Sequence, residues 1–183
     1  MPLTLTAPPA RPPVTLAEIK AHLKIDGAEE DGLLAHLVAA ATRRIEFECA
    51  LAMIDQQWSL LRDCWPRAGV LEIPIHPVRR VDSVKILTES GLVTAAPESY
   101  EVDTASRPAR IRALAGFPPP AKRMNVVEVA LSCGFGDDPA AVPADLRQAV
   151  MLLAAHWHEC REGREDIPPA VRALIAPWRR VAL

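Results

Sequence analysis

The stretch from Thr15 to Cys49 constrains the fold most strongly, because apolar spacing alone indicates two consecutive helices in it. Thr15 and Glu18 have the spacing of a capping box, in which a hydroxyl and a carboxylate satisfy free amides at a helix start. The acidic run 29–31 lies where a second helix would begin, and it would stabilise the positive end of that helix. The second helix carries an apolar stripe at Leu34, Leu37, Val38, Ala41, Ile45 and Cys49. The pattern indicates a packing module rather than a catalytic motif.

Composition narrows the class of protein. The chain has 183 residues, of which 50% are hydrophobic and 24% charged, as expected for one globular domain with tails. A formal net charge of -2 argues against a strongly electrostatic binder of nucleic acid or membranes. The four cysteines are scattered without a CxxC pair, and neither a signal peptide nor a membrane-spanning apolar run is visible. We therefore expect a soluble protein with free thiols, made in the cytoplasm.

The order of the predicted elements gives the fold class. Residues 1–13 are rich in proline and predict an extended arm. From residue 53 the apolar period changes to two, and the clearest strand covers residues 127–131. Pro143 suits the start of a long helix, and Pro168 and Pro169 open a short last one. The sequence therefore predicts an α+β fold with an N-terminal helix pair, a central antiparallel strand-rich region, and a C-terminal long helix plus a short terminal helix. We expect an arm at 1–13, an α+β domain at 14–166 and a C-terminal helix and tail at 167–183.

The sequence HWHEC at residues 156–160 is the segment that most resembles a metal site. On a helix, His156 and His158 point about 200° apart and cannot share one ion. His156 and Cys160 are four residues apart and could share one, but Cys160 continues the apolar stripe of the long helix. A second pair of ligands at compatible spacing is not evident in the sequence. We expect no metal and no cofactor.

Other patterns for catalysis or DNA binding are weak. Cys133 follows a strand, which is a common place for a nucleophile, but a structural thiol is the more frequent explanation of such a cysteine. The glycine cluster CGFGDDP lacks a third glycine, and its two aspartates would repel a phosphate. The linker between the first two helices is too long for a helix-turn-helix motif. A small cytosolic enzyme using His156, Cys160 or Cys133 and a DNA-binding regulator stay open as alternatives.

Taken together, the ordered segments resemble the head–tail connector, or adaptor, family of tailed bacteriophages and gene transfer agents. The segments that carry the resemblance are LAEIKAHLKID, EEDGLLAHLVAAATRRIE, PVRRVDSVKIL, YEVD, VPADLRQAVMLLAAHWHECRE and PPAVRALIAPWR. They cover about residues 14–180 in the order of the family, and none of them is a catalytic signature.

The resemblance implies a non-enzymatic subunit that oligomerises into a ring, typically of twelve copies, at the head–tail interface of the particle. It implies binding to the portal protein on one side and to a stopper, or head-completion, protein on the other. Double-stranded DNA would pass through the central channel without specific binding, and no membrane is involved. We also expect the stripe from Leu34 to Cys49 to face the protein's own sheet.

The C-terminal helix and tail commonly reach the portal in this family. Trp and Arg residues are also enriched at interface hot spots, which favours an anchor at the Arg-Trp segment near the end of the chain. The portal-contacting candidates are Val171, Leu174, Ile175, Trp178, Arg179 and Arg180.

Overall fold

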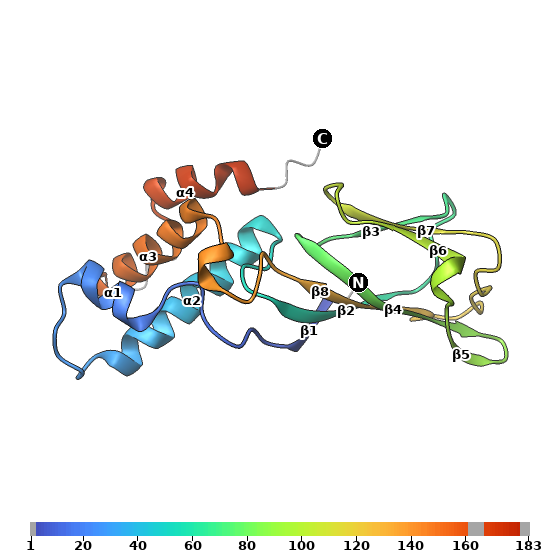
Figure 1. Cartoon of the computed structure of the whole chain (residues 1–183), viewed down its shortest axis with the longest axis horizontal. Coiled ribbons are helices and arrows are strands. Elements are labelled where there is room, and N and C mark those ends of the chain that lie inside the picture. The colour runs from blue at the N-terminus through green and yellow to red at the C-terminus, as the bar shows by residue number, and fades with distance from the viewer. Residues whose placement is uncertain (1–2, 161–166, 180–183) are drawn as a thin grey trace. The chain divides into compact units, whose positions relative to one another are not determined.

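The computed structural model describes residues 3–160 and 167–179. The chain divides into two compact units, and each is built from two separate segments of the sequence. The strand unit comprises Met1–Ala10 and Asp55–Phe135, and the helical unit comprises Arg11–Ile54 and Gly136–Leu183. The α+β fold predicted from the sequence is therefore confirmed, with helices and strands collected in different units (Figure 1).

The larger sheet of the strand unit is antiparallel and has the strand order β1-β2-β8-β4-β5. Its central strand β8 pairs with β2 along one side and with β4 along the other. Val127, Val129 and Leu131 are buried in β8, as their alternation in the sequence predicts. The strands are β1 (Leu3–Ala7), β2 (Gln56–Arg62), β4 (Val78–Thr88), β5 (Gly91–Thr94) and β8 (Val127–Cys133).

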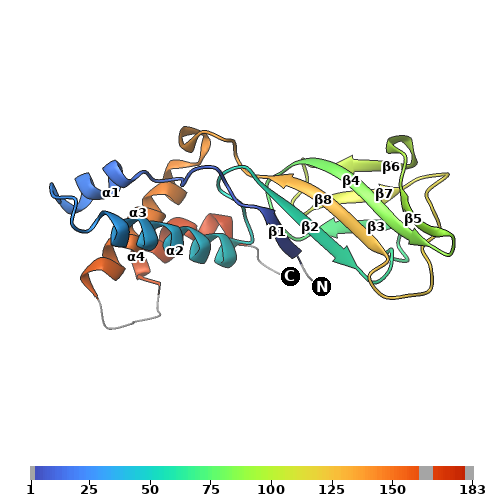
Figure 2. The same cartoon turned by 90° about the horizontal axis from the view of Figure 1, so that it is seen from below.

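The smaller sheet has the order β3-β7-β6, and its strands are β3 (Val70–Ile73), β6 (Tyr100–Asp103) and β7 (Ala109–Ala113). Figures 1 and 2 together show it lying face to face with the larger sheet inside the strand unit. Leu71, Ile73 and Ile111 are buried on its inner face. The other face is charged, and on it Asp103 pairs with Arg110 at 2.5 Å between neighbouring strands. A short 3-10 turn, η1 (Pro97–Ser99), precedes β6.

The helical unit contains α1 (Leu16–Leu23), α2 (Asp31–Cys49), α3 (Ala144–Glu159) and α4 (Pro169–Ile175), with the 3-10 turns η2 (Pro139–Ala141) and η3 (Ala176–Trp178). The capping box at Thr15 and Glu18 is present at the start of α1, as predicted. None of the helices in the described part of the chain is both long and apolar enough to cross a membrane.

Three details differ from the sequence predictions. The buried stripe of α2 has α3 as its main partner, whereas a sheet was expected, because the two longest helices bury their apolar faces against each other. Cys160 is exposed just beyond the end of α3 instead of continuing its apolar stripe. Within the proline-rich N-terminal segment, Leu3–Ala7 forms β1, which pairs with β2 of the same chain.

Candidate interaction surface at the C-terminal helix

The predicted portal-contacting segment consists of α4 and η3. Pro169 occupies the first turn of α4, where its missing N–H costs nothing. Val171 and Ile175, one turn apart, are buried, and α4 packs on α3. The thiol of Cys49, at the end of α2, lies 3.9 Å from the carbonyl oxygen of Ile175 and donates weakly to it. Apolar burial therefore fixes α4 within the helical unit.

Polar contacts fix the residues that follow α4. The indole Nε1 of Trp178 donates a hydrogen bond of 2.6 Å to Oδ2 of Asp145, in the first turn of α3. The guanidinium of Arg179 lies 3.5 Å from Oε2 of Glu48 near the end of α2, and Glu48 also pairs with Arg44 at 3.0 Å. The Arg-Trp segment is therefore connected to both long helices of its own unit.

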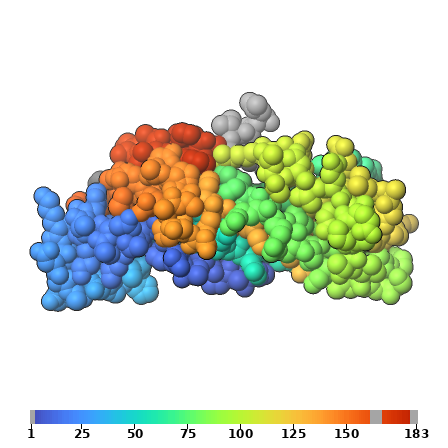
Figure 3. All heavy atoms as spheres, in the orientation of Figure 1, coloured from blue at the N-terminus to red at the C-terminus, as the bar shows by residue number. Residues whose placement is uncertain are grey.

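The six candidate residues divide into two groups. Val171 and Ile175 point into the helical unit, where they hold α4 in place. Leu174 and Trp178 are half-buried, and Arg179 is exposed, so these three have side-chain surface left for a partner. Arg180 lies outside the described residues. Figure 3 shows α4, in red, at the surface of the helical unit beside α3, in orange.

The HWHEC segment has structural partners. Nε2 of His158 lies 2.9 Å from Oε2 of Glu30 at the start of α2, and so connects α3 to that helix. His156 and Cys160 approach each other, with 3.8 Å between Nδ1 and Sγ. Within residues 3–160 and 167–179, no group of three or more His, Cys, Asp or Glu side chains is arranged to hold a metal ion. The two histidines therefore have different partners, Glu30 for His158 and Cys160 for His156.

Cys133 is unsuited to nucleophilic chemistry. Burial, reinforced by the negative charges of Asp82 and Asp55, raises the pKa of its thiol to about 12. At neutral pH the sulfur is therefore protonated and unreactive. The next residue, Gly134, has φ +142, and a Cβ there would lie 2.6 Å from the backbone nitrogen of Asp55. The first glycine of the CGFGDDP cluster, Gly134, thus allows the backbone of Asp55 to approach closely.

Two charged residues have roles that the sequence did not reveal. Arg147 of α3 donates from Nε to the carbonyl oxygen of Pro13 at 3.1 Å and forms an ion pair with Glu18 of α1. Glu46 is buried in α2 and accepts a hydrogen bond of 2.9 Å from the backbone N–H of Met53. No local signal predicts the contacts of Arg147, because its partners are more than 120 residues away in the sequence.

Comparison with known proteins identifies the family. A family model described as phage gp6-like head-tail connector protein matches residues 13–85. A chain from the neck of an empty gene transfer agent particle, solved with C6 symmetry, is 30% identical with a TM-score of 0.84, and the alignment covers 100% of this chain and 97% of that one. This chain belongs to the head–tail connector family. The connector is accordingly a structural protein of a phage-like particle and not an enzyme.

Two further solved structures resemble the connector over its whole length. A chain from the virion of a native gene transfer agent particle is 30% identical, with a TM-score of 0.85. A chain from the neck of a native particle, solved with C12 symmetry, is 32% identical, with a TM-score of 0.80. In both, the alignment covers 100% of the connector and 97% of the other chain. No curated protein sequence is similar enough to count as a relative.

Proposed function

We propose that the connector forms a ring between the portal and the stopper, or head-completion, protein of a phage or gene transfer agent particle. Double-stranded DNA would pass through the centre of this ring during packaging and ejection. The observation that carries the proposal is the whole-length similarity to chains from particle necks with C6 and C12 symmetry. Twelve copies is the number that fits the C12 neck, and it is also compatible with C6 symmetry.

The composition of the connector is compatible with this role. A net charge of -2 provides no strong attraction for the DNA backbone, which suits a channel through which DNA must slide.

We also propose that the outward side chains of the C-terminal segment contact the portal. Leu174, Trp178 and Arg179 combine an apolar surface, an aromatic ring and a guanidinium, which is the composition typical of interface hot spots. Asp145 and Glu48 hold the last two residues in place, so little side-chain freedom would be lost on docking. Val171 and Ile175 support this surface from beneath.

The ring is tested by mixing purified connector with its portal and measuring mass by native mass spectrometry and shape by electron cryomicroscopy. We expect a cyclic assembly attached to the portal. A connector that stays monomeric with and without portal would contradict the proposal.

The portal contact is tested by deleting the residues after Ala176. This deletion should weaken portal docking and leave the connector folded, because the buried side chains of α4 remain. Arg179→Ala should weaken docking less than the deletion, and Arg80→Ala, an exposed arginine of the strand unit, serves as the matched control. Full occupancy of portal complexes by the truncated chain would refute a C-terminal anchor.

A further inference from the structure

The indole of Trp178 has its hydrogen-bond donor already in use. Nε1 donates to Oδ2 of Asp145 at 2.6 Å, and Oδ1 of Asp145 accepts from the backbone N–H of Leu146 at 2.9 Å. A tryptophan side chain carries no second donor and no acceptor. A partner that contacts Trp178 therefore meets the apolar part of the ring, and the contact is favourable only if the partner is apolar there too.

Arg179 has the opposite property, because its guanidinium has more donors than acceptors nearby. It lies 3.5 Å from Glu48, and Glu48 lies closer to Arg44, at 3.0 Å. Two guanidinium groups thus share one carboxylate, and together they carry more N–H groups than this carboxylate can accept. The side chain of Arg179 is 54% exposed, so its remaining donors face solvent and are available to a partner.

The charge of the same surface has an excess of one sign. α4, η3 and Arg179 together contain two arginines, Arg172 and Arg179, and no acidic residue. The carboxylates that contact this segment are Asp145 and Glu48, and Arg44 adds a third positive charge beside Glu48. Positive charge is therefore in excess at the C-terminal segment, and an acidic partner is favoured.

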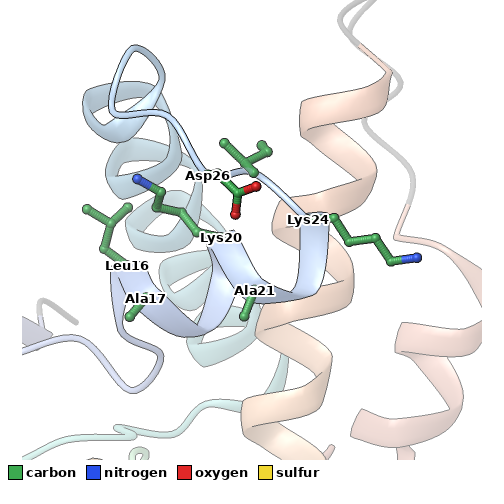
Figure 4. Close-up of a pocket in the computed structure, with 7 residues that line it drawn as sticks. Leu16, Ala17, Lys20, Ala21, Lys24 and Asp26 are labelled. Carbon is green, nitrogen blue, oxygen red and sulfur yellow. The ribbon is translucent and has the colours of Figure 1, made fainter.

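The hollow on the outer face of α1 has balanced charges instead. Figure 4 shows Lys20, Lys24 and Asp26 around it. Lys20 is paired with Asp31 at 2.6 Å, and Lys24 and Asp26 have opposite charges. This hollow favours neither an acidic nor a basic partner, whereas the surplus of donors at Arg179 does select one.

We propose that the portal surface bound by the connector combines an apolar slot for the ring of Trp178 with a carboxylate that pairs with Arg179. This inference rests on the proposed function, and it names the chemistry of the partner at the same segment. A carboxylate matches the planar guanidinium with two parallel hydrogen bonds, and the half-buried Leu174 extends the apolar part. The DNA backbone is a poorer occupant, because Asp145 and Glu48 would repel its phosphates and the indole would gain no apolar slot.

The first experiment measures the Kd for purified portal of connector variants at Trp178 and Asp145. Trp178→Ala removes the ring and should raise the Kd at least about tenfold. Trp178→Phe keeps an aromatic ring and loses the bond to Asp145, so it should raise the Kd only about two- to fivefold. Asp145→Ala should have the same small effect, and the double variant no further one, since both changes remove the same bond. If Trp178→Phe is as damaging as Trp178→Ala while Asp145→Ala has no effect, the indole N–H donates to the portal and the apolar slot is wrong.

The second experiment measures the salt dependence of portal docking in variants of Arg179. Arg179→Ala should raise the Kd about fivefold and make it less sensitive to salt, because an ion pair is lost. Arg179→Lys should recover little, since an ammonium group cannot form two parallel hydrogen bonds to a carboxylate. Arg80→Ala, which removes an arginine paired with Asp82 on the strand unit, is the matched control and should change neither quantity. Unchanged affinity and salt dependence in Arg179→Ala would exclude the carboxylate. Weaker binding of short duplex DNA with unchanged portal docking would assign Arg179 to DNA instead.

Failure of this inference can be distinguished from failure of the proposed function. A wild-type connector that does not bind the portal would overturn the proposed function and this inference with it. Full docking after deletion of the residues beyond Ala176 would remove the C-terminal anchor, and the inference also. Docking that requires the segment but shows one of the contrary results for Trp178 or Arg179 would overturn this inference alone. Circular dichroism checks that every variant is folded.

Discussion

The strand unit and the helical unit each join two distant segments of the chain, but they do so by different means. In the strand unit, β1 of the first segment pairs with β2 of the second through a ladder of backbone hydrogen bonds, and further ladders join β2 and β4 to β8 within the second segment. In the helical unit, apolar helix faces are supplemented by single polar contacts between elements, such as those of Arg147 with Pro13 and His158 with Glu30. The strand unit thus depends on many equivalent interactions, and the helical unit on a few specific ones.

This difference indicates where each unit tolerates change. In the strand unit the stabilisation is distributed over many backbone hydrogen bonds. Only a substitution that leaves a cavity in the core or makes a backbone clash should therefore lower the stability of this unit strongly. A single polar contact depends on two side chains, so replacing one of them should have a smaller effect. The proposed contact surfaces for other proteins also lie on the helical unit, where outward helix faces are available.

The largest effect is expected for Leu131→Ala in the strand unit. Leu131 is fully buried in β8, opposite Trp58 on β2 and Val81 on β4. The substitution should lower the free energy of unfolding by about 2–5 kcal/mol, because it leaves a cavity in a closely packed core. Urea unfolding followed by circular dichroism measures this change. Leu92→Ala on the edge strand β5, where the side chain is 62% exposed, should stay within about 0.5 kcal/mol of the wild type. Equal losses for both variants would contradict a core centred on β8.

A smaller effect, of opposite sign in the two units, is expected from replacing glycine with alanine. Gly134→Ala places a Cβ 2.6 Å from the backbone nitrogen of Asp55 at a positive φ, and should cost about 1–3 kcal/mol. Gly32→Ala in α2 meets nothing within 4 Å and should stabilise the protein by about 0.4–1 kcal/mol, since it restricts the unfolded chain. Thermal unfolding of the two variants measures both changes. A stabilised Gly134→Ala variant would show that the close approach to Asp55 is not needed.

Patterns that repeat locally could be predicted from the sequence. The alternation of Val127, Val129 and Leu131 predicted β8, and the capping box at Thr15 and Glu18 predicted the start of α1. In these cases the residues that define the element are neighbours in the chain. The burial of Val171 and Ile175 likewise follows from their spacing on one helix face, although the same spacing does not reveal that they are unavailable to a partner.

Features that depend on distant partners could not be predicted. Strand β1 lies among prolines that indicate an extended arm, and its partner β2 begins about fifty residues later. The apolar stripe of α2 indicates that this face of the helix is buried. It does not indicate that α3 is the element that covers it. Trp178 and Arg179 could be proposed as interface residues from the sequence, whereas their contacts with Asp145 and Glu48 require the folded chain.

The smallest expected effect concerns a single polar cluster of the helical unit, and it depends on pH. The backbone N–H of Thr15 donates to the Glu18 carboxylate at 2.7 Å, and this bond, with smaller contributions from the Thr15 hydroxyl and Arg147, lowers the pKa of Glu18 below its ordinary value of 4.5. A carboxyl group with a lowered pKa stabilises the folded state above about pH 4.5, and this stabilisation disappears as the pH falls through the lowered value.

Glu18→Gln should therefore cost less than about 1 kcal/mol at pH 7, because the Glu18 side chain is 38% exposed and solvent screens its charge. The difference in unfolding free energy between wild type and variant should shrink when urea unfolding is repeated near pH 3, where wild-type Glu18 is increasingly protonated. If the difference in unfolding free energy is the same at both pH values, the charge of Glu18 does not stabilise the fold. The helical unit would then be stabilised by burial of its apolar helix faces and not by this polar contact.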